Sequence, residues 1–275
     1  MTQTSQDQVP NSRSGRAALN VAVDAALAAG RVLRDRLHTS MKVSFKGRAD
    51  IVTDVDLAAE KAVLDLLREE YPDFGILSEE SKPIESDSPF TWVVDPLDGT
   101  RNYASGISHF CTVVALVHGD QPIVGVTYDP VRQELFTAEK GKGAFLNGER
   151  LSVSGGQELD QALLSCDLGY VDEKAGLALD MIRSLWPGIL SLRLMGSAAL
   201  ALAYAAAGRV DLYFHHSLSP WDIAAGLVLV QEAGGTIVDK QGHPANLHTS
   251  SVIASNRRLV AGFLAATEGL PWRDM

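Results

Sequence analysis

The 275-residue sequence predicts a mixed α/β (α+β) fold on three observations. Residues 16–37 repeat Ala, Val and Leu at three- and four-residue intervals, which is the spacing of an amphipathic helix. Residues 110–153 alternate strand-like runs with turn signals such as HGDQ and NGE, which predicts an antiparallel meander. From residue 161 onward, strand-like and helix-like segments follow one another in mixed order.

Composition is that of an ordinary globular protein, with 46% apolar and 21% charged residues. The net charge of −10 argues against a general partner among nucleic-acid polymers or anionic membranes, because no basic surplus neutralises phosphates. No apolar run reaches membrane-spanning length. The only cysteines, Cys111 and Cys166, lie in apolar surroundings, so we expect no disulfide framework and a reducing, cytoplasmic location.

The chain is expected to begin with a lead-in and to continue in two halves. Residues 1–14 are polar and lack the apolar core of a secretion signal, so we expect them to be disordered. Residues 15–155 form an N-terminal α+β half with most of the candidate metal ligands. Residues 156–275 form a C-terminal α/β half that carries Asp222 and the segment expected to line the substrate pocket.

In the first half, the helix over residues 16–37 is followed by a loop and a second helix near residues 54–71. Thr53 or Asp54 is placed to cap this second helix, and Pro72 lies beyond its end. Two short strands, in FGILSEES and TWVVD, each end in acidic residues. A tight turn after the second strand leads into a helix, and the meander follows.

In the second half, the order of elements is read from apolar spacing and end signals. Ser219 is a candidate N-cap with Pro220 at the first helical position, so Asp222 lies in the first turn of a helix. The other expected elements are strands in ALLSCDLGY, LSLRLM, RVDLYFH, TIVD and SVIAS and helices over residues 173–186, 197–208 and 257–267.

The segment WVVDPLDGTRNY carries the main chemical signal. It places Asp95 and Asp98 three residues apart at the end of an apolar strand, just before Gly99 and Thr100. Mg²⁺ prefers about six oxygen ligands and keeps some waters. Glycine lets the backbone approach a phosphate closely, and N–H groups at a helix start donate to it. The segment therefore predicts a site for divalent cations and a phosphate ester.

Further oxygen ligands for such a site are Glu79, Asp222 and the Leu97 carbonyl. Two ions roughly 3.5–4 Å apart can activate a water and stabilise the leaving oxygen, with Asp95 as the shared ligand. Taken singly, each acid has a simpler explanation, since acids often cap helices or lie in solvated loops. A polar pocket rim or the surface is the simpler expectation for His215 and His216, and a small core residue for Cys111.

Several segments together resemble the inositol monophosphatase family of Mg²⁺-dependent, lithium-sensitive phosphatases. The resemblance covers about residues 16–265, in family order and spacing. Its segments are DIVTDVD, ILSEES, WVVDPLDGTRNY, GAFLNGERLSVS, GSAALALAYAAAGRVD, PWDIAAG and QEAGGTIVD. The resemblance implies a layered αβαβα sandwich of the inositol monophosphatase and fructose-1,6-bisphosphatase type, usually a homodimer, that hydrolyses a small phosphorylated metabolite.

The resemblance also implies roles for individual residues, with two to three Mg²⁺ ions per site. The first ion takes Glu79, Asp95 and the Leu97 carbonyl, the second takes Asp95, Asp98 and Asp222, and a third lies near Glu79. Thr100, held by Asp56, positions and activates the attacking water together with Glu79. The implied substrate-binding residues are Asp98, Gly99, Thr100, Gly196, Ser197, Ala198, His215 and Asp222.

The substrate stays open because His215 occupies a position where members specialised for inositol phosphate carry Glu. The leading expectation is a polyol or sugar phosphate resembling inositol 1-phosphate. The alternatives are a fructose-1,6-bisphosphatase, a histidinol-phosphatase or a 3′,5′-bisphosphate nucleotidase. A second phosphate would require a cation at the pocket, for which Arg101 and Arg193 are the candidates. A non-catalytic protein of this fold would have lost ligands, whereas every matched ligand position keeps an oxygen donor.

Overall fold

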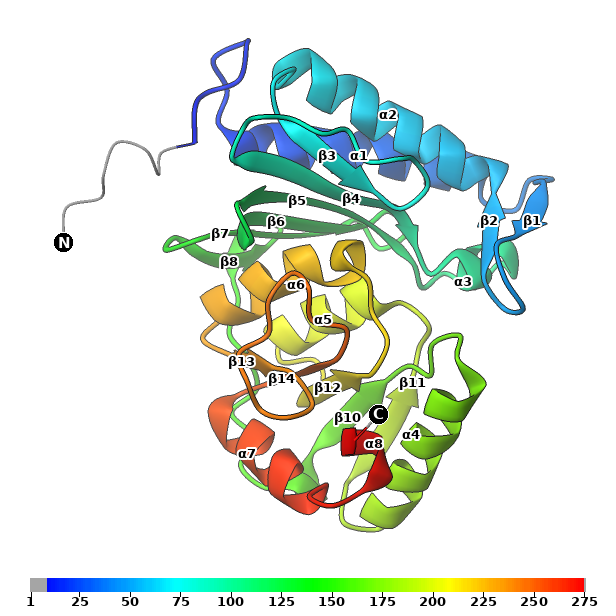
Figure 1. The fold of residues 1–275 in the computed structure, drawn as a ribbon, viewed down its shortest axis with the longest axis vertical. Helices are drawn as coiled ribbons and strands as arrows, with labels where there is room; N and C mark the ends of the chain where they lie inside the picture. The colour runs from blue at the N-terminus through cyan, green and yellow to red at the C-terminus, as the bar shows by residue number, and fades with distance from the viewer. Residues whose placement is uncertain (1–8, 275) are drawn as a thin grey trace.

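Two large β-sheets, each covered by helices on both faces, form the fold of residues 9–274, which are the residues that this computed structural model describes (Figure 1). The first layer is α1 (Ala18–Arg36) and α2 (Asp54–Glu70), and it covers a seven-stranded sheet. Between the sheets lie α5 (Ala198–Ala206) and α6 (Pro220–Glu232). The five-stranded second sheet is covered by α4 (Asp172–Leu185), α7 (Arg257–Ala266) and α8 (Pro271–Asp274). The predicted αβαβα layering is therefore confirmed.

The seven-stranded sheet follows chain order, because each strand pairs with the next. Its first pair is parallel and all the others are antiparallel. The antiparallel meander after Phe110 is thereby confirmed. The strands are β3 (Gly75–Ser78), β4 (Phe90–Asp98), β5 (Cys111–His118), β6 (Gln121–Asp129), β7 (Glu134–Glu139), β8 (Gly143–Leu146) and β9 (Glu149–Arg150).

The five-stranded sheet has the order β11-β10-β12-β14-β13 and is mixed. Its strands are β10 (Leu163–Cys166), β11 (Ser191–Leu194), β12 (Leu212–His215), β13 (Thr236–Val238) and β14 (Val252–Ser255). The chain thus passes from the first sheet to the second between Arg150 and Leu163. This connection contains a short 3-10 helix, Leu159–Gln161. One core joins both sheets through α5 and α6. The division into halves at residue 155 stays a prediction.

Strands of the first sheet are apolar on both faces because helices cover both faces. Trp92 and Val94 of β4 pack in the core that contains α1 and α2, whereas Val93 between them packs in the core that contains α5 and α6. This alternation follows from the pleat of a strand, which sends successive side chains to opposite faces. It explains why the strand before Asp95 is a continuous apolar run.

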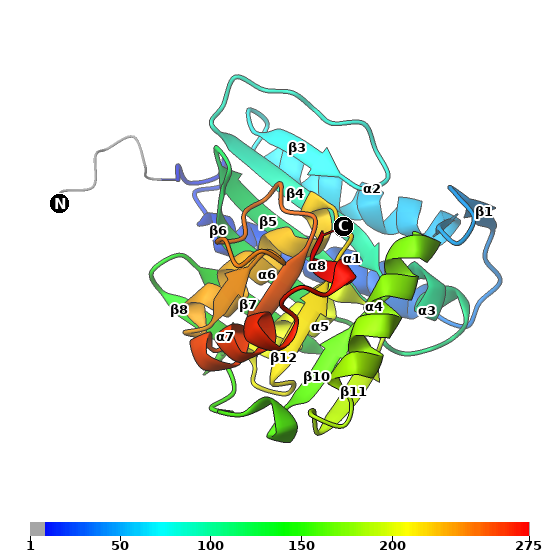
Figure 2. The same cartoon turned by 60° about the horizontal axis from the view of Figure 1, so that its bottom comes forward.

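The middle helices lie between the two sheets. All nine residues of α5 are buried. A helix that is apolar all round must be covered all round, and the two sheets do this. On the outer face of the second sheet, α8 packs against α4 (Figure 2). Within residues 9–274, no helix combines the length and the apolar character that crossing a membrane requires.

Three local expectations differ from the structure. The loop before α2 contains a hairpin, β1 (Val43–Phe45) and β2 (Ile51–Thr53), whose three-residue strands are too short to show a periodicity. The short α8 was also not predicted. The disordered lead-in is wrong for residues 12–14, since Ser12 is buried and the Arg13 N–H donates to the Glu70 carbonyl at 2.9 Å. Residues 1–8 of that expectation lie outside the described residues.

Candidate active site

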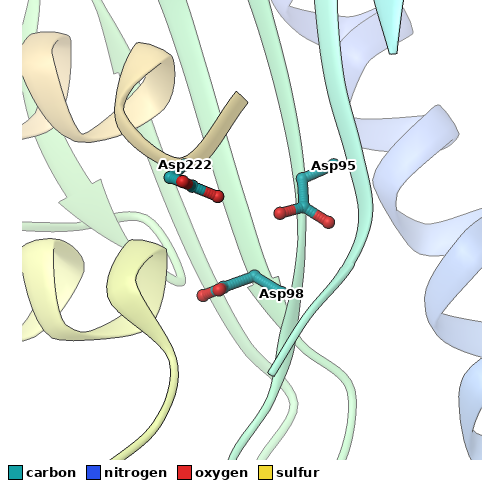
Figure 3. Close-up of side chains that lie close together, drawn as sticks. All are labelled: Asp95, Asp98 and Asp222. Atoms are coloured by element: carbon teal, nitrogen blue, oxygen red, sulfur yellow. The ribbon is translucent and has the colours of Figure 1, made fainter. Parts of the chain in front are cut away.

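Three of the predicted acids converge between the first sheet and the middle helices. Carboxylate oxygens of Asp95, Asp98 and Asp222 all lie within 4.8 Å of one another. Figure 3 shows Asp95 and Asp98 on the strand and Asp222 at the start of the neighbouring helix α6, with their carboxyl groups around one common space. The two strand residues are buried, and Asp222 is partly exposed. Asp222 comes 127 positions after Asp95 and 124 positions after Asp98 in the chain. Folding therefore joins distant positions into one cluster of oxygen donors.

A β-bulge in β4 brings Asp95 and Asp98 to the same face of the sheet. Residues three apart on a regular strand point to opposite faces. Here Asp95 pairs with Val113 and Asp98 with Cys111, so β4 contains one residue more than β5 over this stretch. The extra residue restores the common direction. Both acids thus face α5 and α6.

Asp98 is held by the first turn of α5. Its Oδ2 accepts a hydrogen bond of 2.9 Å from the Ala199 N–H and one of 2.5 Å from the Ser197 hydroxyl, and its Oδ1 lies 3.3 Å from the Ala198 nitrogen. The buried Cys111 thiol lies 3.6 Å from Oδ2. A carboxylate suits a helix N-terminus, where backbone N–H groups lack partners. Ser197 and Ala198 thereby fix the direction of Asp98.

Asp222 occupies the first turn of α6, as the sequence predicts. Ser219 is the N-cap residue and Pro220 the first helical residue. The Ser219 N–H donates to Asp222 Oδ2 at 2.7 Å. One carboxylate oxygen is thus engaged by the chain, which orients the other toward the cluster.

The cluster is electrostatically unfavourable in the absence of cations. Burial raises the pKa of Asp95 well above its usual range, and the charges of Glu79, Asp98 and Asp222 raise it further. Burial also raises the pKa of Asp222, with Asp98 as the next cause. Each of these groups offers only oxygen, which is the donor type that Mg²⁺ prefers. The residues therefore fit a site for hard divalent cations.

Glu79 stands beside the cluster rather than within its group of three. It follows β3, and its Oε1 accepts from the Lys46 ammonium at 2.7 Å. Lys46 also lies 2.9 Å from Glu80. Burial raises the pKa of Glu79 while Lys46 opposes that shift, and the charge of Glu79 in turn raises the pKa of Asp95. Lys46 comes from the β1–β2 hairpin, and no sequence signal pointed to it.

Thr100 lies where the resemblance implies. Its hydroxyl is 3.0 Å from Asp56 Oδ1 and 3.0 Å from the Leu97 carbonyl oxygen. Asp56 is fully buried, and its Oδ2 accepts from the Thr53 N–H at 2.9 Å. Thr53 is the N-cap of α2, so Asp54 is not. Asp54 instead pairs with Arg36 at 2.7 Å.

Gly99 occupies a position that requires glycine. Its φ is 95°, in the left-handed region that side chains avoid. An added Cβ would lie 3.1 Å from the His109 carbonyl oxygen and 3.2 Å from that of Gly196. The turn from β4 into α3 (Thr100–Ala104) can therefore bring the backbone close to the second half of the chain.

A cavity of about 380 Å³ opens beside Asp98 and Asp222, a size within the range of small-molecule sites. Its lining residues are Asp98, Gly99, Arg101, Asn102, Asp167, Leu168, Gly169, Tyr170, Leu194, Met195, Gly196, Ser197, Ala198, His215, Ser217, Leu218 and Asp222. The expected pocket residues Gly196, Ser197, Ala198 and His215 are among them. Arg193 is not, and it is exposed on β11.

Of the two simpler expectations for the histidines, the surface is wrong for both, whereas a place at the pocket is confirmed for His215. His215 and His216 are each only 3% exposed, so neither lies at the surface. His215 forms part of the cavity wall. His216 lies behind it, where the two rings stack with centroids 5.1 Å apart. Burial lowers the pKa of His215 to about 3.

Two acids that the sequence analysis did not single out support the site. Asp167 follows β10 as Asp95 follows the apolar run of β4, and its Oδ1 accepts from Met195 and Gly196 N–H groups at 3.0 and 2.6 Å. Its position at a strand end was the signal that could have found it. Glu60 of α2 accepts hydrogen bonds from both serines that flank the Glu79 segment, Ser78 and Ser81.

Fold and site together define this chain as a phosphatase, a hydrolase of phosphoric monoesters. The model of the inositol monophosphatase family matches residues 16–270, and the chain belongs to that family. Members of this family are generally metal-dependent, which agrees with the cluster of acids.

Individual relatives cover almost the whole chain. Nus factor SuhB of Escherichia coli (strain K12) is 42% identical over 251 residues, which are 90% of this chain and 94% of that protein. Inositol monophosphatase 1 of Solanum lycopersicum is 37% identical over 257 residues, which are 91% of this chain and 94% of that protein. The crystal structure of extragenic suppressor protein suhB from Bartonella henselae has a TM-score of 0.88 and 38% identity, covering 91% of this chain and 98% of that chain.

Proposed function

We propose that this phosphatase hydrolyses a small polyol or sugar phosphate in a Mg²⁺-dependent reaction, by direct attack of water. The observation that carries the proposal is the group of Asp95, Asp98 and Asp222, whose carboxylate oxygens lie within 4.8 Å of one another at the edge of a cavity of about 380 Å³. Glu79 and the Leu97 carbonyl complete the proposed set of ligands for two to three ions. Bound there, Mg²⁺ supplies charge neutralisation and Lewis acidity to the phosphoester.

The chain's own residues position the attacking water in this proposal. The Thr100 hydroxyl proton faces Asp56 Oδ1 and the Leu97 carbonyl, so the lone pairs of Oγ1 are free to accept from water. Glu79, with its raised pKa, is placed to accept the second water proton. Gly99 and Thr100 N–H groups donate to the phosphate. No side chain becomes phosphorylated.

The quaternary and cellular parts of the proposal are a homodimer, lithium sensitivity and a cytoplasmic setting. Both cysteines are buried and unpaired, which supports a reducing compartment. Lithium supplies a test of the site. Millimolar Li⁺ is expected to inhibit the Mg²⁺-driven release of phosphate, and an unaffected rate would contradict this part.

The alternatives share the metal site and differ in substrate. They are fructose 1,6-bisphosphate, histidinol phosphate and nucleoside 3′,5′-bisphosphates. One observation favours a doubly charged substrate among them, since Arg101 lines the cavity. Phosphate release from inositol 1-phosphate, fructose 1,6-bisphosphate, histidinol phosphate, adenosine 3′,5′-bisphosphate and NADP, compared as kcat/KM, chooses among the candidates.

The decisive variant is Asp95→Asn. We expect it to lose nearly all Mg²⁺-dependent turnover while keeping the native circular dichroism spectrum, because the amide is neutral and a poor ligand. The exposed Asp73→Asn change is the matched control, and it should leave turnover unchanged. Turnover of Asp95→Asn at the wild-type rate would end the proposed role of the cluster.

A further inference from the structure

The wall of the cavity contains one cationic side chain, Arg101. Its guanidinium carbon lies 4.5 Å from the centroid of the Tyr170 ring. Within residues 9–274, no carboxylate lies in ion-pair distance of Arg101. Stacking on an aromatic face orients a guanidinium and leaves the N–H groups at its edge available. Arg101 therefore offers a flat, oriented fork of donors to a ligand in the cavity.

His215 contributes a second donor of fixed direction. The Ser217 N–H donates to His215 Nδ1 at 3.0 Å, so Nδ1 is the acceptor and the ring proton lies on Nε2. Among the described residues, no atom accepts a hydrogen bond from Nε2, although His215 is only 3% exposed and lines the cavity. A donor in a cavity wall that has no protein partner is free to donate to an acceptor atom of a ligand.

Asp167 is the only carboxylate of the cavity wall outside the proposed metal ligands. Two backbone N–H groups occupy its Oδ1, and the Tyr213 hydroxyl lies 3.4 Å from its Oδ2. Oδ2 thus keeps capacity for a hydroxyl donor, as a sugar would supply. Its negative charge opposes an anion close by, so an anionic group of the substrate must lie toward Arg101 instead.

We infer that the substrate of this site is a hydroxylated phosphomonoester that carries a second anionic group, a phosphate or a carboxylate, which Arg101 and His215 bind. The inference rests on the proposed function and names its substrate class. Asp167 takes a hydroxyl of the carbon skeleton, and the acid cluster lies at the ester that is cleaved. A simple polyol phosphate offers Arg101 no second anionic group, so it lacks one charge-assisted contact.

The test uses three sugar esters that share a phosphate at carbon 6. Glucose 6-phosphate has no second anion, glucose 1,6-bisphosphate has a second phosphate and 6-phosphogluconate has a carboxylate. Wild-type enzyme with Mg²⁺ is expected to show a kcat/KM at least about tenfold higher for one of the two esters with a second anionic group than for glucose 6-phosphate. The preferred ester identifies the second group.

Variants then assign that preference to side chains. Arg101→Gln is expected to lower the preference about tenfold or more, chiefly through KM, and Arg101→Lys is expected to restore part of it. Arg193→Gln is the matched control, because Arg193 is exposed and lies outside the cavity wall. His215→Glu, which replaces a donor by an anionic acceptor, should lower the preference further.

Calorimetric titration of the three sugar esters in the presence of Ca²⁺ measures their binding without turnover. Ca²⁺ replaces Mg²⁺ here because it accepts the same protein oxygen atoms with looser geometry. An Arg101-dependent preference in binding without any Mg²⁺-driven hydrolysis would refute the proposed function and support only the role of Arg101 in binding a second anionic group. Hydrolysis with an equal preference in wild type and Arg101→Gln would overturn the inference and leave the proposed function intact.

Discussion

The carboxylate of Asp98 accepts a hydrogen bond of 2.9 Å from the backbone N–H of Ala199, in the first turn of α5. A candidate metal ligand of the first sheet is thus also the partner of a helix in the middle layer. Among residues 9–274, Asp95 accepts no hydrogen bond from a helix of the middle layer, and its Oδ1 instead accepts from the N–H of its neighbour Leu97 at 3.0 Å.

This difference predicts opposite effects on stability. Without metal, Asp95→Asn should be as stable as wild type or more stable, because it removes one charge from a buried cluster. Asp98→Asn replaces an acceptor of helix N–H groups and should be less stable than Asp95→Asn by about 1–2 kcal/mol. Urea unfolding of both variants in the absence of metal measures the difference, and equal midpoints would show that Asp98 does not support α5.

Glu60 predicts an effect on metal affinity at a distance from the ligands. Its carboxylate accepts from the Glu80 N–H at 3.1 Å, besides the Ser78 and Ser81 hydroxyls, and so fixes the segment that carries Glu79. Glu60→Ala should raise the Mg²⁺ concentration for half-maximal activity about 10–100-fold. Glu69→Ala, on the exposed face of the same helix, is the control. An unchanged Mg²⁺ requirement would mean that Glu79 keeps its position without Glu60.

Lys46 predicts competition between a side chain and a metal ion. Burial lowers the pKa of Lys46, but its contacts with Glu79 and Glu80 outweigh this and raise the pKa above its usual value. A cation that binds Glu79 must displace this ammonium. Lys46→Met should therefore lower the Mg²⁺ concentration for half-maximal thermal stabilisation by a factor of about five.

The control for that change is Lys61→Met, which removes an exposed pair with Asp65 on α2. It should leave the Mg²⁺ titration unchanged. Weaker Mg²⁺ binding in Lys46→Met would show that Lys46 assists the metal site rather than competing with it.

His109 predicts a pH-dependent stability. It is buried, and neither ring nitrogen has a partner among the described residues. Burial, aided by Arg132, lowers the pKa of His109 to about 4. The unfolded state, with an ordinary pKa near 6.5, therefore binds more protons between about pH 6.5 and pH 4, so stability from this residue is lost as the pH falls through that window.

Phenylalanine keeps the ring that contacts Tyr204 and removes the proton site. At pH 8 the free energy of unfolding, measured by urea denaturation, should be about 1 kcal/mol higher for His109→Phe than for wild type, because an unpartnered polar group is removed. The gain should grow by about 1–2 kcal/mol at pH 5. An equal gain in the free energy of unfolding at pH 8 and pH 5 would show that the pKa of His109 in the folded protein is not lowered.

The sequence predicts most elements of the fold because their apolar patterns are local. The bounds of helices α1 and α2 lie within two residues of the predicted ones, and the meander is confirmed. The β1–β2 hairpin was not predicted, since each strand has three residues. Its exposed residues do not alternate with buried ones, so no period distinguishes it from a loop.

Some features of the candidate site also have a local signal in the sequence, whereas others arise only from tertiary contacts. Thr53 and Ser219 are recognisable caps, and they place Asp56 and Asp222 in the first turns of their helices. The convergence of Asp222 with Asp95 depended on the resemblance to a family, because no local pattern links positions 127 residues apart. Lys46, Glu60 and the buried His215 are single side chains whose contacts arise only from tertiary packing.

The bulge in β4 has a consequence for how this segment can change length. On a regular strand, two side chains point to the same face when an even number of positions separates them. Because of the bulge, Asp95 and Asp98 are three positions apart and still point to the same face. Shortening Asp95–Asp98 by one residue would therefore keep both carboxylates on the same side of the sheet, at the expense of the Leu97 carbonyl. Lengthening it by one would turn Asp98 toward α2, even though every acid remained in the sequence.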